Sequence, residues 1–320
     1  MGFIQKALVA LGLVGSLTQA LPRTGLKTRA GGGKLAIYWG AEDDNLSLQT
    51  VCDDPTYDIV NLAFLAYFHG PGGYPTLSLS GLNGPSAAQQ QAGATGLQDG
   101  SSLVPAIQSC QQNGKKVILS MGGAVDYADV TLQSDSDGQA IADQIWNLFL
   151  GGTSLSSLRP FGNIKLDGVD LDNESGNANG YVAMTKRFRS NFAQDTSKKY
   201  YLTAAPQCPY PDASEPLDVC VLLDYVWVQF YNNGDCNIAQ SGFNSAVQQW
   251  SNGIGNATLF IGGLASGADG DQGYVDAATF ESAIQGVKNM NLPNYGGAML
   301  WEAQLSVNNG NYAQQIRSSL

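Results

Sequence analysis

The chain has 320 residues, of which 43% are hydrophobic and 13% charged, so it holds enough apolar material for one large core or two ordinary domains. Its 16 basic residues stand against 27 acidic ones, which gives a formal net charge of −11. A surface of that sign repels phosphate backbones and anionic lipid, so no nucleic acid and no membrane partner is expected, whereas a neutral polymer is not excluded.

The first twenty residues have the pattern of a secretory signal. A positive start over residues 1–6 precedes an apolar run from Ala7 to Leu17, and the small residues up to Ala20 suit a signal peptidase. The apolar run is too short to span a bilayer. We therefore expect residues 1–20 to be removed, residues 21–33 to form a short leader, and residues 34–320 to form one secreted, extracellular domain.

From residue 34 onward, short apolar runs alternate with helix-sized spacers. Near-continuous apolar runs are typical of strands covered on both faces, and the spacers 139–150 and 181–192 repeat apolar residues at intervals of three and four, as helices do. Eight strands are predicted, over Leu35–Gly40, Ile59–Phe68, Lys116–Gly123, Leu166–Glu174, Tyr200–Gln207, Tyr225–Asn232, Leu259–Ala265 and Gly297–Trp301.

Eight strands with crossover helices predict an α/β protein with a single (β/α)8 TIM barrel. An open, doubly wound sheet is the alternative, but it would carry a glycine-rich phosphate turn after its first strand, and residues 38–42 contain none. The loosely composed loop 69–102 follows the second strand, on the active-site side of a barrel. It either walls a cleft or is an insertion without a role in the site.

Cysteine and histidine usage narrows the chemistry. Five cysteines behind a secretory signal predict two disulfides and one spare thiol, with the pairing left open. His69 is the only histidine and no G-x-S-x-G motif occurs, so neither a His-based zinc site nor a Ser-His-Asp triad is expected. No metal and no cofactor is predicted.

The fourth predicted strand carries a row of carboxyl groups. Alternate residues of a strand point the same way, so Asp170, Asp172 and Glu174 share one face, which points into a barrel. Burial and mutual repulsion oppose ionisation there, so at least one carboxyl should hold a proton near neutral pH, as a general acid must. A calcium site or helix cap is the competing interpretation, but an EF-hand loop needs Gly at Ser175 and Glu at Tyr181.

These residues also carry a family resemblance. The run from Asp167 to Glu174 resembles the D-G-x-D-x-D-x-E motif of glycoside hydrolase family 18, and the segment 120–123 resembles the S-x-G-G element of that family. The similarity extends from Lys34 to the C-terminus. Four more segments are similar to the plant class III and fungal chitinases of the hevamine type: 36–40, 202–209, 226–233 and 299–301.

The resemblance implies a secreted endochitinase that hydrolyses β-1,4 bonds in chitin or chitooligosaccharides with retention, through attack by the substrate's own N-acetyl oxygen. It implies that Glu174 is the proton donor and that Asp172 holds the acetamido N–H and stabilises the oxazolinium intermediate. Asp170 would share a proton with Asp172, and Tyr231 would position the acetamido oxygen.

The resemblance also assigns binding and structural residues. Trp301 would form the floor under the reacting sugar, and Tyr38, Gln229 and Asn232 would line the same subsite. Structural roles fall to Asp167, Ser120, Gly122 and Gly123. The implied disulfides are Cys52–Cys110 and Cys208–Cys236, which would leave Cys220 free and buried.

Departures and alternatives accompany these expectations. Plant members have Gln-Asn where this chain has Ala41-Glu42, and they have a further cysteine pair that is absent here, so chain-length preference stays open. A catalytically weak chitin-binding lectin or inhibitor of the same fold is one alternative function, and an endo-β-N-acetylglucosaminidase acting on N-glycans is another. A monomer is expected.

Overall fold

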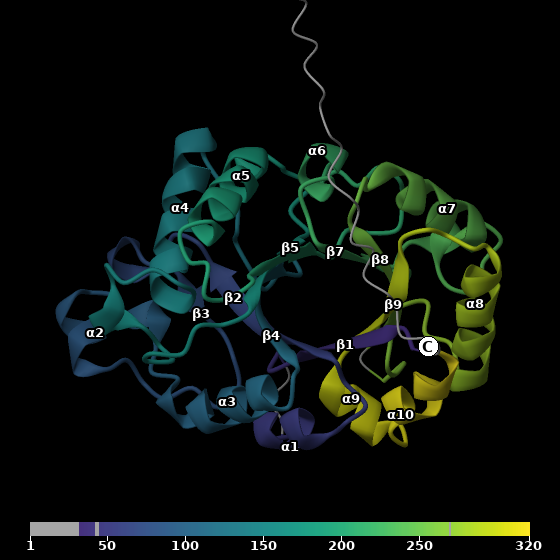
Figure 1. Cartoon of the computed structure of the whole chain (residues 1–320), viewed down its shortest axis with the longest axis horizontal. Coiled ribbons are helices and arrows are strands. Elements are labelled where there is room, and N and C mark those ends of the chain that lie inside the picture. Colours follow the sequence, from purple (N-terminus) through teal and green to yellow (C-terminus); the bar gives the residue numbers. More distant parts are fainter. Residues whose placement is uncertain (1–31, 42–44, 269) are drawn as a thin grey trace, which may run out of the picture.

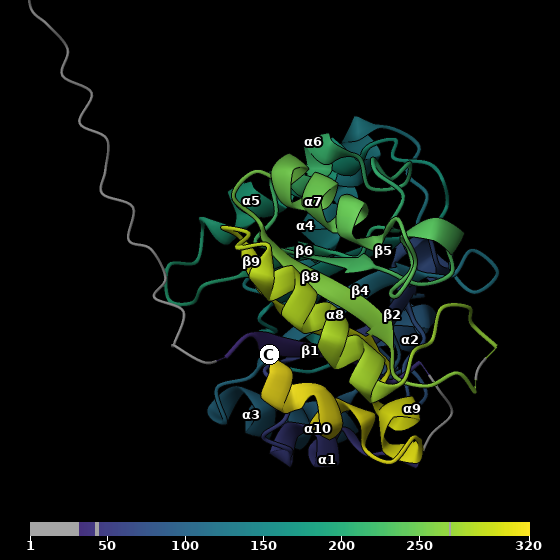
Figure 2. The ribbon, with the colours of Figure 1, turned by 90° about the vertical axis from the view of Figure 1, so that its right-hand side faces the viewer.

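The computed structural model describes residues 32–41, 45–268 and 270–320, so the predicted signal and nearly all of the leader lie outside the described residues. Within them, eight parallel strands close into a barrel in the order β1, β2, β4, β5, β6, β7, β8, β9, with β9 pairing back to β1. Figure 1 looks into this ring of strands, with the helices arranged around it, and Figure 2 shows α8 running along its outer side. The predicted single (β/α)8 TIM barrel is confirmed.

The eight predicted strands all occur, with small shifts of their ends. The barrel strands are β1 Lys34–Trp39, β2 Ile59–Tyr67, β4 Lys116–Gly123, β5 Gly168–Asn173, β6 Tyr201–Ala204, β7 Tyr225–Gln229, β8 Thr258–Leu264 and β9 Tyr295–Trp301, and β3 Thr76–Leu77 pairs antiparallel with β2. The helices are α1 Leu48–Asp53, α2 Ala87–Gln91, α3 Val104–Gln112, α4 Asp135–Phe149, α5 Tyr181–Phe192, α6 Leu217–Cys220, α7 Phe243–Gly253, α8 Ala277–Asn289, α9 Ala303–Asn308 and α10 Tyr312–Ile316.

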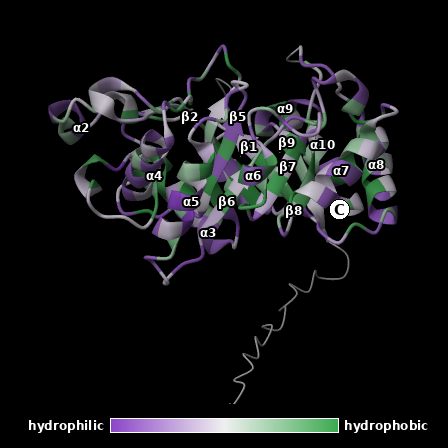
Figure 3. Ribbon diagram, turned by 90° about the horizontal axis from the view of Figure 1, so that it is seen from above, coloured by the Kyte–Doolittle hydropathy of each residue, from purple (hydrophilic) through white to green (hydrophobic). Residues whose placement is uncertain are grey.

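Alternating side chains build two hydrophobic layers on the strands. In β1, Leu35, Ile37 and Trp39 belong to the large cluster between strands and helices, whereas Ala36 and Tyr38 belong to a smaller cluster inside the barrel. The strands are mainly hydrophobic and the connecting loops mainly hydrophilic (Figure 3). Because the strands are covered on both faces, their apolar runs were readable from the sequence.

The carboxyl ends of β6 and β7 leave the ladder earlier than the sequence predicts. Pro206 has no N–H to donate, so β6 ends at Ala204, and only an isolated bridge joins Gln207 to Gln229 beyond it. After β7 ends at Gln229, Asn232 takes a left-handed backbone conformation with φ 61°. These segments become the loops at the mouth of the barrel.

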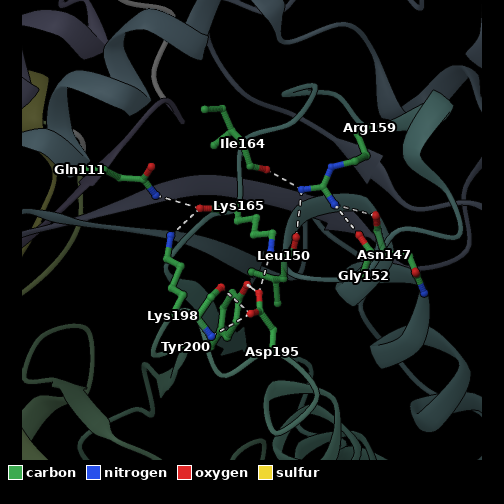
Figure 4. A network of polar contacts seen from close by, with 11 residues as sticks. Gln111, Asn147, Leu150, Gly152, Arg159, Ile164, Lys165, Asp195, Lys198 and Tyr200 are labelled. Carbon is green, nitrogen blue, oxygen red and sulfur yellow. Dashed lines mark hydrogen bonds and ion pairs between the residues drawn. The ribbon is translucent and has the colours of Figure 1, made fainter.

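The connection from α4 to β5 is held by a polar network at the opposite end of the barrel (Figure 4). The guanidinium of Arg159 donates to the backbone carbonyl oxygens of Asn147, Gly152, Leu150, Gly162 and Ile164. Asn147 lies in the last turn of α4 and the other four carbonyls lie in the irregular segment that follows it, so Arg159 satisfies acceptors that the helix and the sheet leave unpaired. The network anchors the segment that leads into β5.

The loop 69–102 is an ordered insertion on the flank of the barrel. It contains β3 and α2, and the Gln89 amide donates to the carbonyl oxygens of Gln98 and Leu158 at 2.7 and 3.0 Å. Figure 1 places α2 at the periphery, outside the ring of strands. The side chains that line the central cavity come from other segments. Of the two interpretations left open by the sequence, the structure therefore favours an insertion that does not wall the site.

Two disulfides close loops of different size. Cys52 pairs with Cys110, joining α1 to α3, and Cys208 pairs with Cys236, joining the loops after β6 and β7. These are the pairs that the family resemblance implied. Cys220 is buried, and its thiol donates to the carbonyl oxygen of Glu215 at 3.2 Å.

Removing the first disulfide should destabilise the fold without touching the central cavity. The double variant Cys52→Ala/Cys110→Ala frees a loop with a sequence separation of 58 residues. In the chain-entropy account a loop of this size corresponds to about 4 kcal/mol of unfolding free energy. Denaturant unfolding of the wild type and the variant measures this loss, and a difference below about 1 kcal/mol would show that loop closure contributes little here.

Candidate active site

One cavity opens at the carboxyl ends of the barrel strands. Carboxyl ends of parallel strands meet at one face of such a barrel, so side chains from several strands converge there. Its wall combines carboxyls, amides and aromatic rings and is formed by Tyr38, Phe64, Gly123, Ala124, Asp172, Glu174, Gln229, Tyr231, Asn232, Asp271 and Trp301.

Most of the side chains predicted from the sequence meet at this cavity. Four predicted residues instead lie behind its wall or at the far end of the strands: Asp167, Asp170, Ser120 and Gly122. Gly122 has φ +122°, and a Cβ at this position would lie 2.0 Å from the carbonyl oxygen of Asp172. Only glycine fits there, because the backbone of β4 runs so close to β5.

Asp167 makes hydrogen bonds and an ion pair at the amino end of β5. One carboxylate oxygen of Asp167 accepts hydrogen bonds from the backbone N–H of Val117 at 2.8 Å and from Gln111 at 3.0 Å. The other lies 3.1 Å from the ammonium group of Lys198. Asp167 therefore joins β4 to β5 at the end of the strands remote from the cavity.

Asp170 is wholly buried beneath the cavity and fully hydrogen-bonded. Ser120 and Tyr38 each donate a hydroxyl hydrogen bond to Oδ2 at 2.8 Å, and Thr203 donates to Oδ1 at 2.7 Å. The indole N–H of Trp227 donates in turn to the Tyr38 hydroxyl at 3.0 Å. Burial raises the pKa of Asp170 to about 6, although the three hydroxyl groups favour its charged form.

Asp172 and Glu174 are joined by one amide group. Nε2 of Gln229 lies 3.0 Å from Oδ1 of Asp172 and 3.0 Å from Oε1 of Glu174, and 2.9 Å from the carbonyl oxygen of Ala205. Asp172 is 4% exposed, whereas Glu174, the first residue after β5, is only partly buried and reaches the open cavity. The strand thus places Asp172 in the buried part of the cavity wall and Glu174 nearer its opening.

The electrostatics of this pair favour protonation. Burial, followed by the charges of Glu174 and Asp170, raises the pKa of Asp172 well above its ordinary value, against the hydrogen bond from Gln229. Burial also raises the pKa of Glu174, and the charges of Asp271 and Asp212 act in the same direction. A partly exposed carboxyl that keeps its proton can act as a general acid toward a molecule in the cavity.

Aromatic rings form the remaining wall. The rings of Trp301 and Phe64 stack with centroids 5.7 Å apart and planes inclined by 18°, and Tyr38 lies 5.5 Å from Trp301. Phe64 also contacts the edge of Tyr127, which is 36% exposed. Flat apolar faces beside carboxyl groups suit a ligand that combines C–H surfaces with polar groups, as a pyranose ring does.

Phe64, Ala124 and Asp271 line the cavity and Glu215 lies behind it, and none of these four residues was identified from the sequence. Phe64 lies within a strand that is apolar except for Asn61, and nothing in that run distinguishes a cavity residue from a core residue. Asp271 belongs to the loop between β8 and α8 and accepts a hydrogen bond from Asn232 at 2.9 Å. Glu215 is fully buried behind β5, where it accepts the backbone N–H of Asn173 at 3.0 Å. Both carboxyls occur in loops with no periodic signal that points to the site.

Comparison with known proteins shows which family the chain belongs to. Residues 34–262 match the family model described as Glycosyl hydrolases family 18. The chain is 64% identical over 319 residues to Endochitinase 3 of Metarhizium robertsii, an alignment that covers 99% of this chain and 100% of the relative.

Solved structures resemble the whole barrel. A chitinase from Ipomoea carnea superposes with a TM-score of 0.76 at 33% identity, covering 90% of this chain and 100% of that one. A xylanase and α-amylase inhibitor protein from Scadoxus multiflorus superposes with a TM-score of 0.75 at 30% identity, covering 89% and 98%. Since proteins with different activities share this barrel, the activity has to be argued from the site.

Proposed function

Because this chain belongs to family 18 of the glycosyl hydrolases and is a chitinase, we propose that it cuts β-1,4 bonds inside chains of N-acetylglucosamine with retention of configuration. In this proposal Glu174 donates the proton to the glycosidic oxygen, and the acetamido oxygen of the sugar on the glycon side attacks the anomeric carbon. Water then opens the cyclic oxazolinium intermediate, with Glu174 as the base.

The carboxyl pair is the observation that carries the proposal. Oδ1 of Asp172 and Oε1 of Glu174 each lie 3.0 Å from the same nitrogen of Gln229, so they are at most twice that distance apart. An inverting pair keeps its carboxyls roughly 6.5–9.5 Å apart to admit a water molecule between acid and base. The closer spacing of Asp172 and Glu174 argues against an inverting pair of acid and base.

The burial of Asp172 argues for the substrate as nucleophile. A retaining enzyme needs a group that attacks the anomeric carbon, and a carboxyl group of the protein could do so only in its ionised form. Since burial and neighbouring charges raise the pKa of Asp172 well above its ordinary value, its neutral form is favoured. We assign Asp172 instead to the acetamido N–H and, once the proton that it shares with Asp170 has passed to Asp170, to the positive charge of the intermediate. The Tyr231 hydroxyl is assigned to the acetamido oxygen.

The remaining wall residues are assigned to substrate binding. Trp301 would carry the apolar face of the reacting sugar, and Asn232 and Gln229 would line the same subsite. Asp170 would share a proton with Asp172, with Tyr38 completing its hydrogen bonds.

Export from the cell is part of the proposal. The signal assigned to residues 1–20 lies outside the described residues, but both disulfides are of a kind that persists in an oxidising compartment. Among the residues that the structure describes, no helix has the length and apolar character to cross a membrane. Mass spectrometry of the protein purified from culture medium should find an N-terminus after residue 20.

Product analysis on three substrates tests the function. The chain should cleave the N-acetylglucosamine hexamer internally, and it should not cleave fully deacetylated chitosan, because that polymer lacks the attacking acetamido oxygen. Binding of the hexamer without cleavage would favour the lectin or inhibitor alternative. Release of the glycan from a high-mannose glycopeptide, with the hexamer left intact, would favour the endo-β-N-acetylglucosaminidase alternative.

A further inference from the structure

Three amide side chains connect end to end behind the carboxyl pair. Nδ2 of Asn233 donates to Oε1 of Gln207, and Nε2 of Gln207 donates to Oε1 of Gln229 at 3.1 Å. Nε2 of Gln229 then contacts Asp172 and Glu174. The chain of amides runs from a partly exposed loop after β7 to the two carboxyls.

Backbone carbonyl groups at both ends set the direction of this chain. A carbonyl oxygen can only accept, so the Asn233 group that lies 2.8 Å from the oxygen of Tyr231 must be its NH2. At the other end, the Gln229 group that lies 2.9 Å from the oxygen of Ala205 must likewise be its NH2. Only one orientation of Gln207 satisfies both neighbours, with its oxygen toward Asn233 and its nitrogen toward Gln229.

A disulfide holds the two loops that carry this chain. Gln207 directly precedes Cys208, and Cys208 is bonded to Cys236 across a Cα separation of 5.9 Å. The Cys236 sulfur lies 3.7 Å from the carbonyl oxygen of Asn233. The loops after β6 and β7 are therefore tied together beside the hydrogen bond between Asn233 and Gln207.

We propose that Gln207 is a positioning residue for the hydrolytic reaction: oriented by Asn233, it holds the Gln229 amide with its N–H groups toward Asp172 and Glu174. Gln229 is 3% exposed, so its oxygen has no ready replacement donor when Gln207 is removed. A buried acceptor without a donor is unfavourable, so the amide rotates or shifts to find another partner. The carboxyls then lose the N–H groups that favour their charged forms.

The pH profile separates this role from a general loss of structure. The charged groups that face Glu174 are Asp172 on the same segment, Asp212 from the loop after β6 and Asp271 from the loop after β8, and all three remain when Gln207 is changed. Because the Gln229 N–H lowers the pKa of Glu174, losing it raises that pKa. The alkaline limb of the kcat profile should therefore move to higher pH.

The test compares Gln207→Met with the wild type on the N-acetylglucosamine hexamer. Methionine keeps the length of the side chain and removes its donor, so kcat should fall roughly 10-fold, with KM little changed, which is the effect of one lost positioning hydrogen bond. As a matched control, Asp271→Asn removes a charge that raises the pKa of Glu174 and should move the alkaline limb to lower pH. A downward or absent shift in Gln207→Met would overturn the proposal.

A double-mutant cycle shows whether Gln207 acts through Gln229. In a Gln229→Met background, Gln207→Met should lower kcat by less than about 2-fold, because the amide that it orients is gone. If Gln207→Met lowers kcat by the same factor in the wild type and in Gln229→Met, the proposal is contradicted. Should Gln207→Met fail to fold, Asn233→Leu changes the partly exposed end of the chain of amides instead. The alkaline limb of its kcat profile should also move to higher pH, by less than in Gln207→Met. An unchanged kcat profile in Asn233→Leu would contradict the proposal.

The inference rests on the proposed function, and the same experiment separates the two. A wild type that leaves the hexamer uncut would overturn both. An active wild type with an unchanged Gln207→Met variant would overturn the positioning role alone.

Discussion

Glu174→Gln should lower turnover of chitin oligomers by at least ~10²-fold while leaving oligomer binding close to that of the wild type. Glutamine keeps the shape of the side chain and its acceptor oxygen toward Gln229, but it has no proton acidic enough to transfer to a leaving oxygen. The aromatic floor and the carboxyl of Asp172 are untouched. Steady-state kinetics on the hexamer and calorimetric titration with the uncleaved oligomer measure the two quantities.

A second glutamate provides the control. Glu281 lies on α8, outside the cavity, and accepts a hydrogen bond from Ser319 at 3.0 Å. Glu281→Gln makes the same chemical change as Glu174→Gln, and it should leave turnover unchanged. A Glu174→Gln enzyme with a near wild-type rate would assign the general acid to another group.

Asp172→Asn should lower kcat on the order of 10²-fold, the scale found when one preorganised stabilising group is removed from an active site. The substitution keeps the volume of a side chain that is 4% exposed, but it removes the capacity for negative charge beside the positive oxazolinium. Its amide oxygen can still accept the hydrogen bond from Gln229, so the variant removes the charge and keeps that contact. The effect should fall on kcat more than on KM, because the charge develops only as the bond breaks.

Asp218→Asn is the matched control for this variant. Asp218 is exposed in the first turn of α6, and its loss should change neither constant. An Asp172→Asn enzyme that retains more than about a third of wild-type turnover would remove the stabilising role from Asp172.

Much of this site was predictable because it lies on strands. Apolar runs gave the eight barrel strands, since strands covered on both faces are hydrophobic almost throughout. Alternation within β5 then predicted that Asp170, Asp172 and Glu174 share one face. Gln229 contacts the last two from β7, which is separated from β5 by one strand. The alternation of side chains within one strand is a local property, so it can be predicted from the sequence without knowledge of the fold.

The rest of the site depends on contacts between segments distant in sequence. Phe64 is a cavity residue only because β2 brings it beside Trp301, and Asp271 reaches the cavity through a loop whose path is set by Asn232. The orientation of the Gln229 amide requires Gln207, which precedes it by 22 residues. No spacing rule in the sequence relates such partners, because hydrogen bonds between loops obey the tertiary packing and not a period.

The stereochemistry of the first product distinguishes attack by the acetamido oxygen from direct attack by water. If the acetamido oxygen attacks and water then opens the oxazolinium, two inversions at one carbon restore the starting configuration. Proton NMR of a fresh digest of the hexamer should therefore show the β-anomer first, with the α-anomer appearing only as the product equilibrates. An initial α-anomer would mean direct attack by water and would contradict the roles assigned to Asp172 and Tyr231.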